Sequence, residues 1–281
     1  DHRDLHSFPT RRSSDLPLGA FLSGGIDSTV VVALMQAMAR RPVRTFTIGF
    51  HESGYNEAEH ARAVATHLGT EHTELYVTSR QAMEVIPSLP ALYDEPFADS
   101  SQIPTHLVSA LARREVTVSL SGDGGDELFG GYNRYFWAMR LWRRLGRLPQ
   151  PLRRALAAMA LSPSPATWDR LFHLAGPLLP ASLRYANPGD KVHKTATLFA
   201  ARQPEAIYLR LVSHWEDPAA IVLGASEPAT AVTDPARWLA SDDFAQRMMY
   251  LDTVTYLPDD ILVKVDRSEE HTSELQSLAY L

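Results

Sequence analysis

Two short stretches of the chain combine glycines, serines and acids in patterns suited to binding phosphate. The first spans residues 21–28, where paired glycines sit between two serines. Glycine permits backbone conformations closed to other residues and lets a ligand approach the main chain. Serine hydroxyls and the unpaired N–H groups of a following helix would favour an anion. The residues predicted to bind phosphate in this turn are Ser23, Gly24, Gly25 and Ser28.

An acid rather than a lysine accompanies this first turn. The spacing differs from that of the common P-loop, and no lysine within it would neutralise a terminal phosphate. Asp27 makes sense beside phosphates if a divalent cation lies between them, because Mg²⁺ is commonly held by carboxylates and phosphate oxygens. The alternative is an ordinary glycine-rich turn with a serine cap. The first stretch alone does not decide between the two.

The second stretch favours the ligand-binding interpretation. A short apolar strand at 116–120 opens into a glycine-rich, acidic turn at 121–127, followed by a helical pattern. Two such turns at the carboxyl ends of two strands are typical of ligand sites in open α/β sheets. Asp27 and Asp126 both occupy turn-to-helix junctions, where an acid could also be only a helix cap. Because each lies in a glycine-rich turn, both acids are also candidates for holding Mg²⁺.

Together these motifs resemble a known enzyme family. Ser-Gly-Gly-Ile-Asp-Ser and Ser-Gly-Asp-Gly-Gly-Asp-Glu-Leu-Phe-Gly-Gly-Tyr are similar to the synthetase domain of glutamine-hydrolysing asparagine synthetases. In that ATP-pyrophosphatase family the first turn grips the pyrophosphate of ATP. The resemblance covers residues 17–267, and its second motif is the more specific one.

The resemblance assigns expected roles to individual residues. It implies that Asp27 and Asp126 hold Mg²⁺ on the pyrophosphate, and that Asp27 and Asp123 are catalytic. Some asparagine synthetases have glutamate at the position of Asp123, where it is implicated in forming the acyl-adenylate. Aspartate is about one methylene shorter than glutamate, so whether Asp123 has the same role is left open. The residues that the resemblance places beside the adenosine of ATP are Leu22, Ile48, Ser121 and Gly122.

The expected reaction is ATP-dependent amidation of aspartate. The β-carboxylate would attack the α-phosphorus of ATP to give β-aspartyl-adenylate and pyrophosphate, and ammonia, normally derived from glutamine, would release asparagine and AMP. Two alternatives stay open. One is a related amidotransferase or cyclase acting on another carboxylate; the other is an inactive ATP-binding fragment, because the family's domain continues past residue 267 and supplies a lysine there.

The surrounding pattern alternates strands and helices. Apolar runs at 18–22, 43–50, 71–77 and 116–120 predict strands, and helical spacing separates them. Val30, Leu34, Ala37 and Met38 recur at that spacing and predict a helix after the first turn. This order predicts an α/β fold with a mostly parallel, doubly wound sheet. Residues 93–101 are acidic and turn-like, and they suit either a helix cap or a position beside the substrate aspartate.

Helical patterns alone follow residue 131. Both termini are polar, lack a helical period and resemble translated sequencing-adapter DNA. The arginines between 143 and 154 most simply form a solvated helix surface. The expected segments are a non-native tail at 1–16, an ATP-pyrophosphatase domain at 17–146, a helical subdomain at 147–233, the start of the remaining synthetase region at 234–267, and a second non-native tail at 268–281.

Composition limits the class of protein. A net charge of −6 argues against binding nucleic acid by bulk electrostatics, and no apolar run approaches membrane-spanning length. We therefore expect a soluble, cytoplasmic protein. The chain has no cysteine, so it cannot contain the nucleophilic cysteine of the glutaminase domain found in the resembling enzymes. The full-length protein is a possible homodimer.

Overall fold

The computed structural model describes residues 16–51, 56–176, 187–199, 201–213, 215 and 220–268. Residues 1–15 and 269–281, which make up most of the two expected tails, lie outside these ranges. Contacts divide the chain into two compact units. One contains the residues up to 128 and those from 255 onward, and is called the sheet unit. The other, residues 129–254, is called the helical unit.

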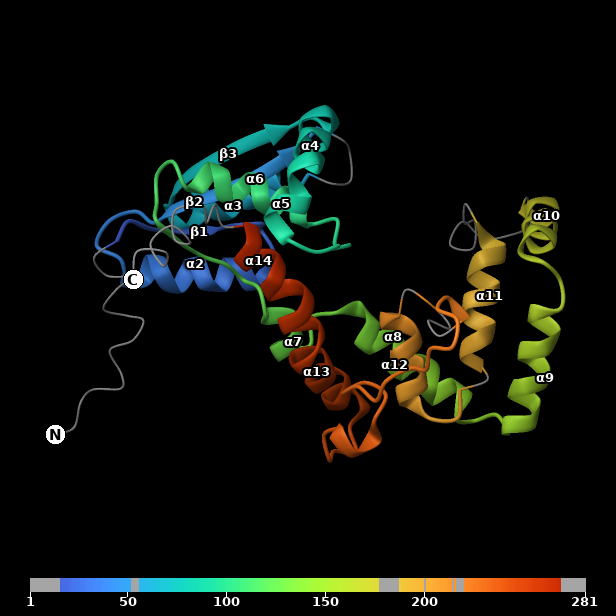
Figure 1. The fold of residues 1–281 in the computed structure, drawn as a ribbon. Helices are drawn as coiled ribbons and strands as arrows, with labels where there is room; N and C mark the ends of the chain where they lie inside the picture. Colours follow the sequence, from blue (N-terminus) through green and yellow to red (C-terminus); the bar gives the residue numbers. More distant parts are fainter. Residues whose placement is uncertain are drawn as a thin grey trace. The chain divides into compact units, whose positions relative to one another are not determined.

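The sheet unit is built on four parallel strands in the order β3-β2-β1-β4 (Figure 1). Gly19 of the central strand β1 pairs with Arg44 on one side and with Ser119 on the other. Parallel neighbours require crossover connections, and helices supply them. The strands are β1 (Leu18–Phe21), β2 (Arg44–Phe50), β3 (Glu71–Val77) and β4 (Val118–Leu120). The helices between them are α2 (Ile26–Met38), α3 (Ala58–Leu68), α4 (Ser79–Val85), the 3₁₀ turn η1 (Ile86–Ser88), α5 (Leu89–Tyr93) and α6 (Gln102–Ala112).

Helices cover both faces of this sheet. On one face, Ala20 and Leu22 form a buried cluster with Val32 of α2 and with Ala61 and Ala65 of α3. A second cluster on the other face joins β2 to α6 and to the start of the chain leading into β4. Its buried members are Phe46, Leu111, Ala112 and Val116. The predicted α/β fold with a parallel, doubly wound sheet is confirmed.

The helix predicted after the first turn forms as α2, but the apolar residues whose spacing predicts it are exposed. Val30, Leu34 and Met38 are exposed, with Met38 at 86%, whereas Ser28 and Val32 are the buried residues of this helix. Residues 30–35 are all apolar, so the sequence offers no polar side to contrast with a buried one. Only packing against α3 and the sheet selects the inner face.

Local side chains and backbone conformations mark the ends of several helices. Gly69 ends α3 in the left-handed conformation, with a φ of 71°, which glycine adopts without the Cβ penalty. Thr78 begins α4 with a capping box, in which its hydroxyl accepts the N–H of Gln81 while the Gln81 side chain accepts the N–H of Thr78. Asn56 accepts the N–H of Ala58 at the start of α3.

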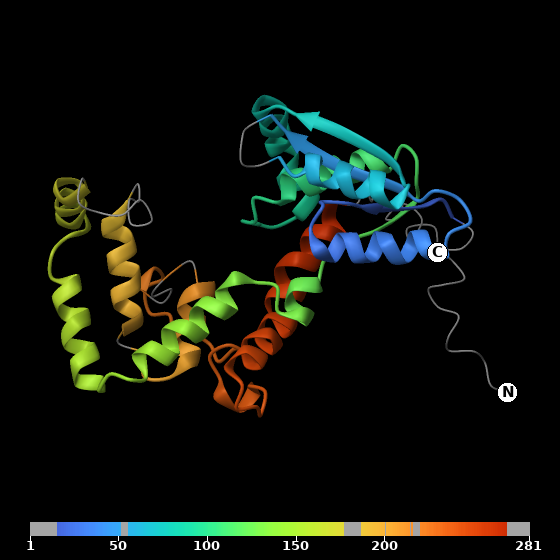
Figure 2. The same ribbon diagram turned by 180° about the vertical axis from the view of Figure 1, so that it is seen from behind.

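The helical unit, whose ribbon is seen from behind in Figure 2, has a core of its own. It contains α8 (Asn133–Leu145), α9 (Gln150–Leu161), α10 (Pro165–Ala175), α11 (Pro188–Phe199), α12 (Pro204–Val212), the 3₁₀ turn η5 (Pro235–Arg237) and α13 (Phe244–Val254). Its buried cluster takes Tyr135, Ala138 and Leu145 from α8, together with Tyr208 of α12 and Leu251 of α13. Because α8 buries its inner face here, contacts group it with this unit rather than with the segment 17–146.

The last described residues return to the sheet unit. From residue 255 they form the π-helix η6 (Leu257–Ile261) and α14 (Leu262–Ser268), whereas the short helix α7 (Gly125–Phe129) follows β4. α14 packs against α5 and α6 (Figures 1 and 2). Within the described ranges, no helix is both long enough and apolar enough to cross a membrane.

Candidate functional site

The two glycine-rich turns meet at the carboxyl end of the sheet. A Cβ placed on Gly122 would lie 2.6 Å from the backbone nitrogen of Ser28, and one placed on Gly125 would overlap the carboxyl group of Asp27. Any side chain at either glycine would force the turns apart. The structure therefore brings together two motifs that lie about a hundred residues apart in the chain, and it shows why glycine is required at their contact.

Hydroxyl groups hold the first turn in shape. The oxygens of Ser23 and Ser28 lie 3.0 Å apart, and the Ser28 oxygen also accepts the Ser23 N–H. Gly24 has a φ of 79°, and a Cβ there would lie 2.7 Å from the backbone nitrogen of Ala61. The turn is thus seated against the start of α3, and its conformation is open only to glycine.

The helix that follows begins without a side-chain cap. Gly25 is the N-cap of α2, and it has no side chain that could accept a hydrogen bond from the N–H groups of the helix. A serine is therefore not the N-cap at which this helix begins. The N–H groups of a first helical turn have no intrahelical acceptors, so they and the helix dipole suit a phosphate group at this position.

Asp27 and Asp126 lie on the two sides of this contact. Asp27 faces Gly125, and Asp126 is the next residue in the chain and is also half-buried. Among the residues that the structure describes, no group of three or more histidines and acids could hold a metal ion. Two carboxylates do fit Mg²⁺ that is bound mainly through phosphates and water, the usual mode for this ion. Their role as ligands stays a prediction.

The remaining residues of the second turn lie at its tip. Asp123 is exposed, and its N–H donates to the hydroxyl of Ser121 at 3.5 Å. Gly124 takes a φ of 86°, and Leu257 of η6 is the nearest side chain to it, 3.8 Å from a Cβ built there. An exposed carboxylate at a fixed turn could reach a bound substrate. The catalytic role expected for Asp123 remains a prediction.

The two apolar residues expected beside adenosine lie on opposite faces of the sheet. Leu22 is 1% exposed and packs with α2 and α3. Ile48 is half-buried and packs on the other face, against the cluster around Phe46. The Leu22 N–H already donates to the Phe46 carbonyl at 2.9 Å. The Leu22 side chain is therefore part of the core, and a contact of Leu22 with a nucleotide stays a prediction.

The loop before α6 pairs with α14, which the sequence did not indicate. Lys264 lies 3.6 Å from Asp99, Arg267 lies 3.1 Å from Asp94, and the hydroxyls of Tyr93 and Ser268 are 3.1 Å apart. No local pattern links residues 93–99 to residues 264–268. The sequence shows only that acids occur in the first segment and bases in the second. That complementary charge is the one signal that could have suggested the pairing.

Hydrogen bonds fix the carboxylate of Asp99. Ser101 donates its N–H to one oxygen at 2.8 Å and its hydroxyl to the other at 2.6 Å. Burial alone would raise the pKa of Asp99, but the hydrogen bonds from Ser101 and the charge of Lys264 outweigh it and hold the pKa below its usual value. Asp99 is therefore a carboxylate at neutral pH.

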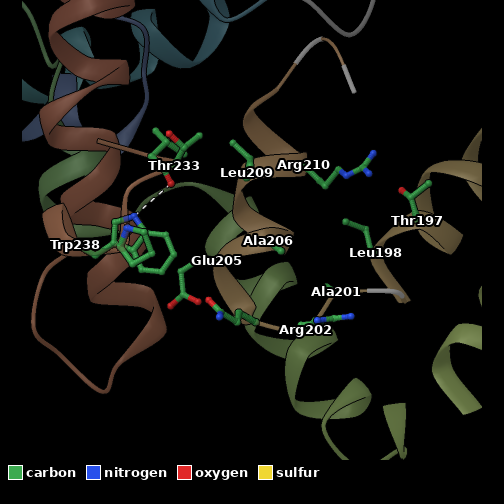
Figure 3. A pocket seen from close by; sticks show the side chains of 13 residues that line it. Thr197, Leu198, Ala201, Arg202, Glu205, Ala206, Leu209, Arg210, Thr233 and Trp238 are labelled. Atoms are coloured by element: carbon green, nitrogen blue, oxygen red, sulfur yellow. Dashed lines mark hydrogen bonds between the residues drawn. The ribbon is translucent and has the colours of Figure 1, made fainter. Parts of the chain in front are cut away.

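A separate cavity of about 490 Å³ lies within the helical unit (Figure 3). Leu198, Leu209 and Trp238 contribute its apolar walls. The carboxylate of Glu205 at its rim already pairs with Arg247, and the indole N–H of Trp238 donates to a backbone carbonyl. None of the site residues predicted from the sequence lines this cavity.

Comparison with known proteins agrees with the chemistry of the two turns. The sequence pattern of the asparagine synthase family matches residues 6–274. The chain itself is 34% identical to a putative glutamine-hydrolysing asparagine synthetase of Mycobacterium tuberculosis over 256 residues. These are 90% of this chain and 36% of that protein.

Two further relatives match about half of the chain. A putative glutamine-hydrolysing asparagine synthetase of Methanocaldococcus jannaschii is 44% identical over 144 residues, which are 51% of this chain and 28% of the relative. Asparagine synthetase 1 of Bacillus subtilis is 38% identical over 147 residues, 52% of this chain and 23% of that enzyme. The chain thus spans between about a quarter and a third of the length of these relatives.

Proposed function

Because this chain belongs to the asparagine synthase family, we propose that its sheet unit binds Mg²⁺·ATP and activates the β-carboxylate of aspartate as an acyl-adenylate. Ammonia then displaces AMP and gives asparagine. The observation that carries this proposal is the contact between the two turns, which sets Asp27 against Gly125. That contact brings glycine backbone, serine hydroxyls and two carboxylates close together.

The residues of this site have separable tasks. The backbone of the first turn and the start of α2 would bind the pyrophosphate portion of ATP, which orients the α-phosphorus for in-line attack. Asp27 and Asp126 would hold Mg²⁺, whose positive charge offsets the charge that develops on the departing pyrophosphate. Asp123 at the exposed tip would contact the acceptor side of the site. Ser121, Gly122 and Ile48 would contact the adenosine, and Leu22 would do so through its main chain.

Several features of the whole enzyme belong to the proposal only. The relatives are named as glutamine-hydrolysing, so we propose that glutamine-derived ammonia serves the complete protein through its glutaminase domain. A homodimer of the full-length protein and a cytoplasmic location complete the proposal. Neither nucleic acid nor a membrane is a proposed partner.

The direct experiment is Mg²⁺-dependent release of pyrophosphate from ATP with aspartate and ammonia. It is run on the chain and on residues 16–268 alone. We expect release that requires aspartate and is lost by at least about a hundredfold in Asp27→Ala, because removing a group that stabilises transition-state charge costs about 2.7 kcal/mol or more. Asp242→Ala, at an exposed acid of the helical unit, is the matched control.

Other outcomes separate the alternatives. Release that depends on a different carboxylate would assign the chain to a related amidotransferase or cyclase. ATP binding detected by calorimetry without any release would identify an ATP-holding fragment. Release that persists unchanged in Asp27→Ala would contradict the site itself.

A further inference from the structure

We infer that Lys264 binds the carboxylate of the acceptor substrate beside the nucleotide, and that Asp99 positions Lys264 for this contact. The inference rests on the proposed function and adds to it the residue that receives the acceptor. It depends on four features of the sheet unit: the path of residues 255–268, the direction of α6, the environment of the Lys264 ammonium, and the charge of the site.

Residues 255–268 run along the edge of the sheet where the two turns lie. Leu257 of η6 lies beside Gly124 of the second turn. Farther along, α14 packs on α5 and α6, and its last residue, Ser268, reaches the hydroxyl of Tyr93. This segment therefore extends from the phosphate-binding turns to the loop 93–101.

The loop 93–101 belongs to the same edge. α6 leads directly into β4, which is parallel to β1. A helix that returns the chain between parallel strands runs opposite to them, so the first turn of α6 lies at their carboxyl ends. Asp99 and Ser101 immediately precede α6. They consequently share this edge with Asp27 and Gly122, where open α/β sheets bind their ligands.

The ammonium of Lys264 can donate hydrogen bonds beyond its ion pair with Asp99. Its side chain is only 10% exposed, and its distance to the Asp99 carboxylate is 3.6 Å, longer than a direct N–H···O hydrogen bond. Asp99 is itself held by both donors of Ser101. A nearly buried lysine held by one long ion pair can still donate to a ligand oxygen, since an ammonium carries three N–H groups.

The chemistry of the site calls for such a cation. The acceptor carboxylate must approach a triphosphate, and the two turns, 21–28 and 121–127, contribute four acids but no lysine. Arg267, one helical turn beyond Lys264, is 43% exposed and pairs with the exposed Asp94. Lys264 is the more buried of the two cations of this segment, and charge interactions are less screened where water is excluded.

The step that Lys264 assists is the attack of the acceptor carboxylate on ATP. One oxygen of the acceptor carboxylate forms a bond to the α-phosphorus while the bond from that phosphorus to the pyrophosphate oxygen breaks. The electron pair of the broken bond leaves with pyrophosphate. The second carboxylate oxygen accepts a hydrogen bond from the Lys264 ammonium, which orients the attack and reduces repulsion between the two anions.

The test measures binding and needs no turnover. Calorimetry on the chain gives the affinity for α,β-methylene-ATP with Mg²⁺, whose α–β bridge cannot be cleaved, and then for aspartate in that complex. We expect Lys264→Gln to weaken aspartate binding by about ten- to a hundredfold and to leave the nucleotide affinity within about twofold. Lys264→Arg restores part of the aspartate affinity, and Asp99→Asn weakens it less than Lys264→Gln does. Arg267→Gln, on the same helix, is the matched control and leaves aspartate binding unchanged.

Each other outcome is decisive. Equal aspartate affinity in Lys264→Gln and the original chain, with only a lower melting temperature, would show that the ion pair serves stability alone and would overturn the inference. Nucleotide binding without any aspartate binding by the original chain overturns it too, while leaving the ATP site intact. Failure to bind the nucleotide at all would overturn the proposed function as well.

Discussion

Asp27 of the sheet unit and Asp252 of the helical unit show two different uses of a carboxylate. Asp252 is fully buried and accepts hydrogen bonds from the hydroxyls of Tyr135 and Tyr208 and from the guanidinium of Arg134 at 2.8 Å. Asp27 is only half-buried and faces a glycine. A buried acid saturated by protein donors can only hold a fold together, whereas an acid placed against bare backbone can serve a ligand.

The tyrosines in the helical unit are adapted to that structural role. Burial, together with the negative charge of Asp252, raises the pKa of Tyr208 far above its usual value, and the same causes act on Tyr135. Both hydroxyls therefore stay protonated and donate across the accessible pH range. This network links α8, α12 and α13, and a comparable set of donors around Asp27 would leave it unable to serve Mg²⁺.

The largest expected effect is on the buried carboxylate. Asp252→Ala should lower the free energy of unfolding of the helical unit by about 3–5 kcal/mol, because it leaves a buried arginine and two hydroxyls without their acceptor. All five tryptophans lie within 129–254, so their fluorescence during urea unfolding reports on this unit. Asp242→Ala serves as the exposed control. A loss below about 1 kcal/mol would show that water replaces the carboxylate and that the comparison is wrong.

The next largest effect is expected at Asp27, where a substitution should weaken ligand binding and leave stability unchanged. Gly125→Ala places a methyl group on Asp27 and should weaken Mg²⁺·ATP binding by about ten- to a hundredfold, since overpacking of this kind costs about 1–3 kcal/mol. The urea midpoint read from tryptophan fluorescence should not move. Gly176→Ala is the matched control, because a Cβ there meets nothing within 4 Å. If Gly125→Ala leaves the nucleotide affinity unchanged, the contact between the two turns is not needed for ATP binding.

The pair between Asp99 and Lys264 predicts a pH dependence at the acidic end. Because folding lowers the pKa of Asp99, its contribution to stability is complete above the unfolded pKa of about 4 and disappears as pH falls through the lower folded value. Thermal melting of the chain from pH 7 to pH 2 should therefore fall less steeply below about pH 4 in Asp99→Asn. Parallel curves for the two proteins would show that Asp99 does not contribute to acid unfolding.

The smallest expected effect concerns a local signal with no link to either carboxylate. Thr78→Ala removes the capping box of α4 and should cost about 1 kcal/mol. Circular dichroism melting measures it, and Thr78→Ser, which keeps the hydroxyl, should lose much less. If Thr78→Ala lowers stability as much as Asp252→Ala does, the exposed cap of α4 contributes as much to stability as the buried hydrogen bonds of Asp252.

Tertiary structure decided the features that depend on packing between distant segments. The inner face of α2 could not be predicted from an unbroken apolar run, and the separation of Leu22 and Ile48 onto two faces depends on strand pairing. Asp252 draws its donors from positions 44 to 118 residues away. The contact of Lys264 with Asp99 likewise joins segments that share no local pattern. Such pairings are set by how whole elements bury their surfaces.

The sequence by itself determined the parts of this protein that local chemistry specifies. Adjacent glycines, hydroxyls and an acid specify each turn, and alternating apolar runs with capped helices specify a parallel sheet that carries both turns at one edge. These features follow from backbone freedom, capping hydrogen bonds and strand propensity, which act over a few residues. Which acid meets a ligand and which is buried as an anchor was decided only when the folded chain placed Asp27 against a glycine and Asp252 among three donors.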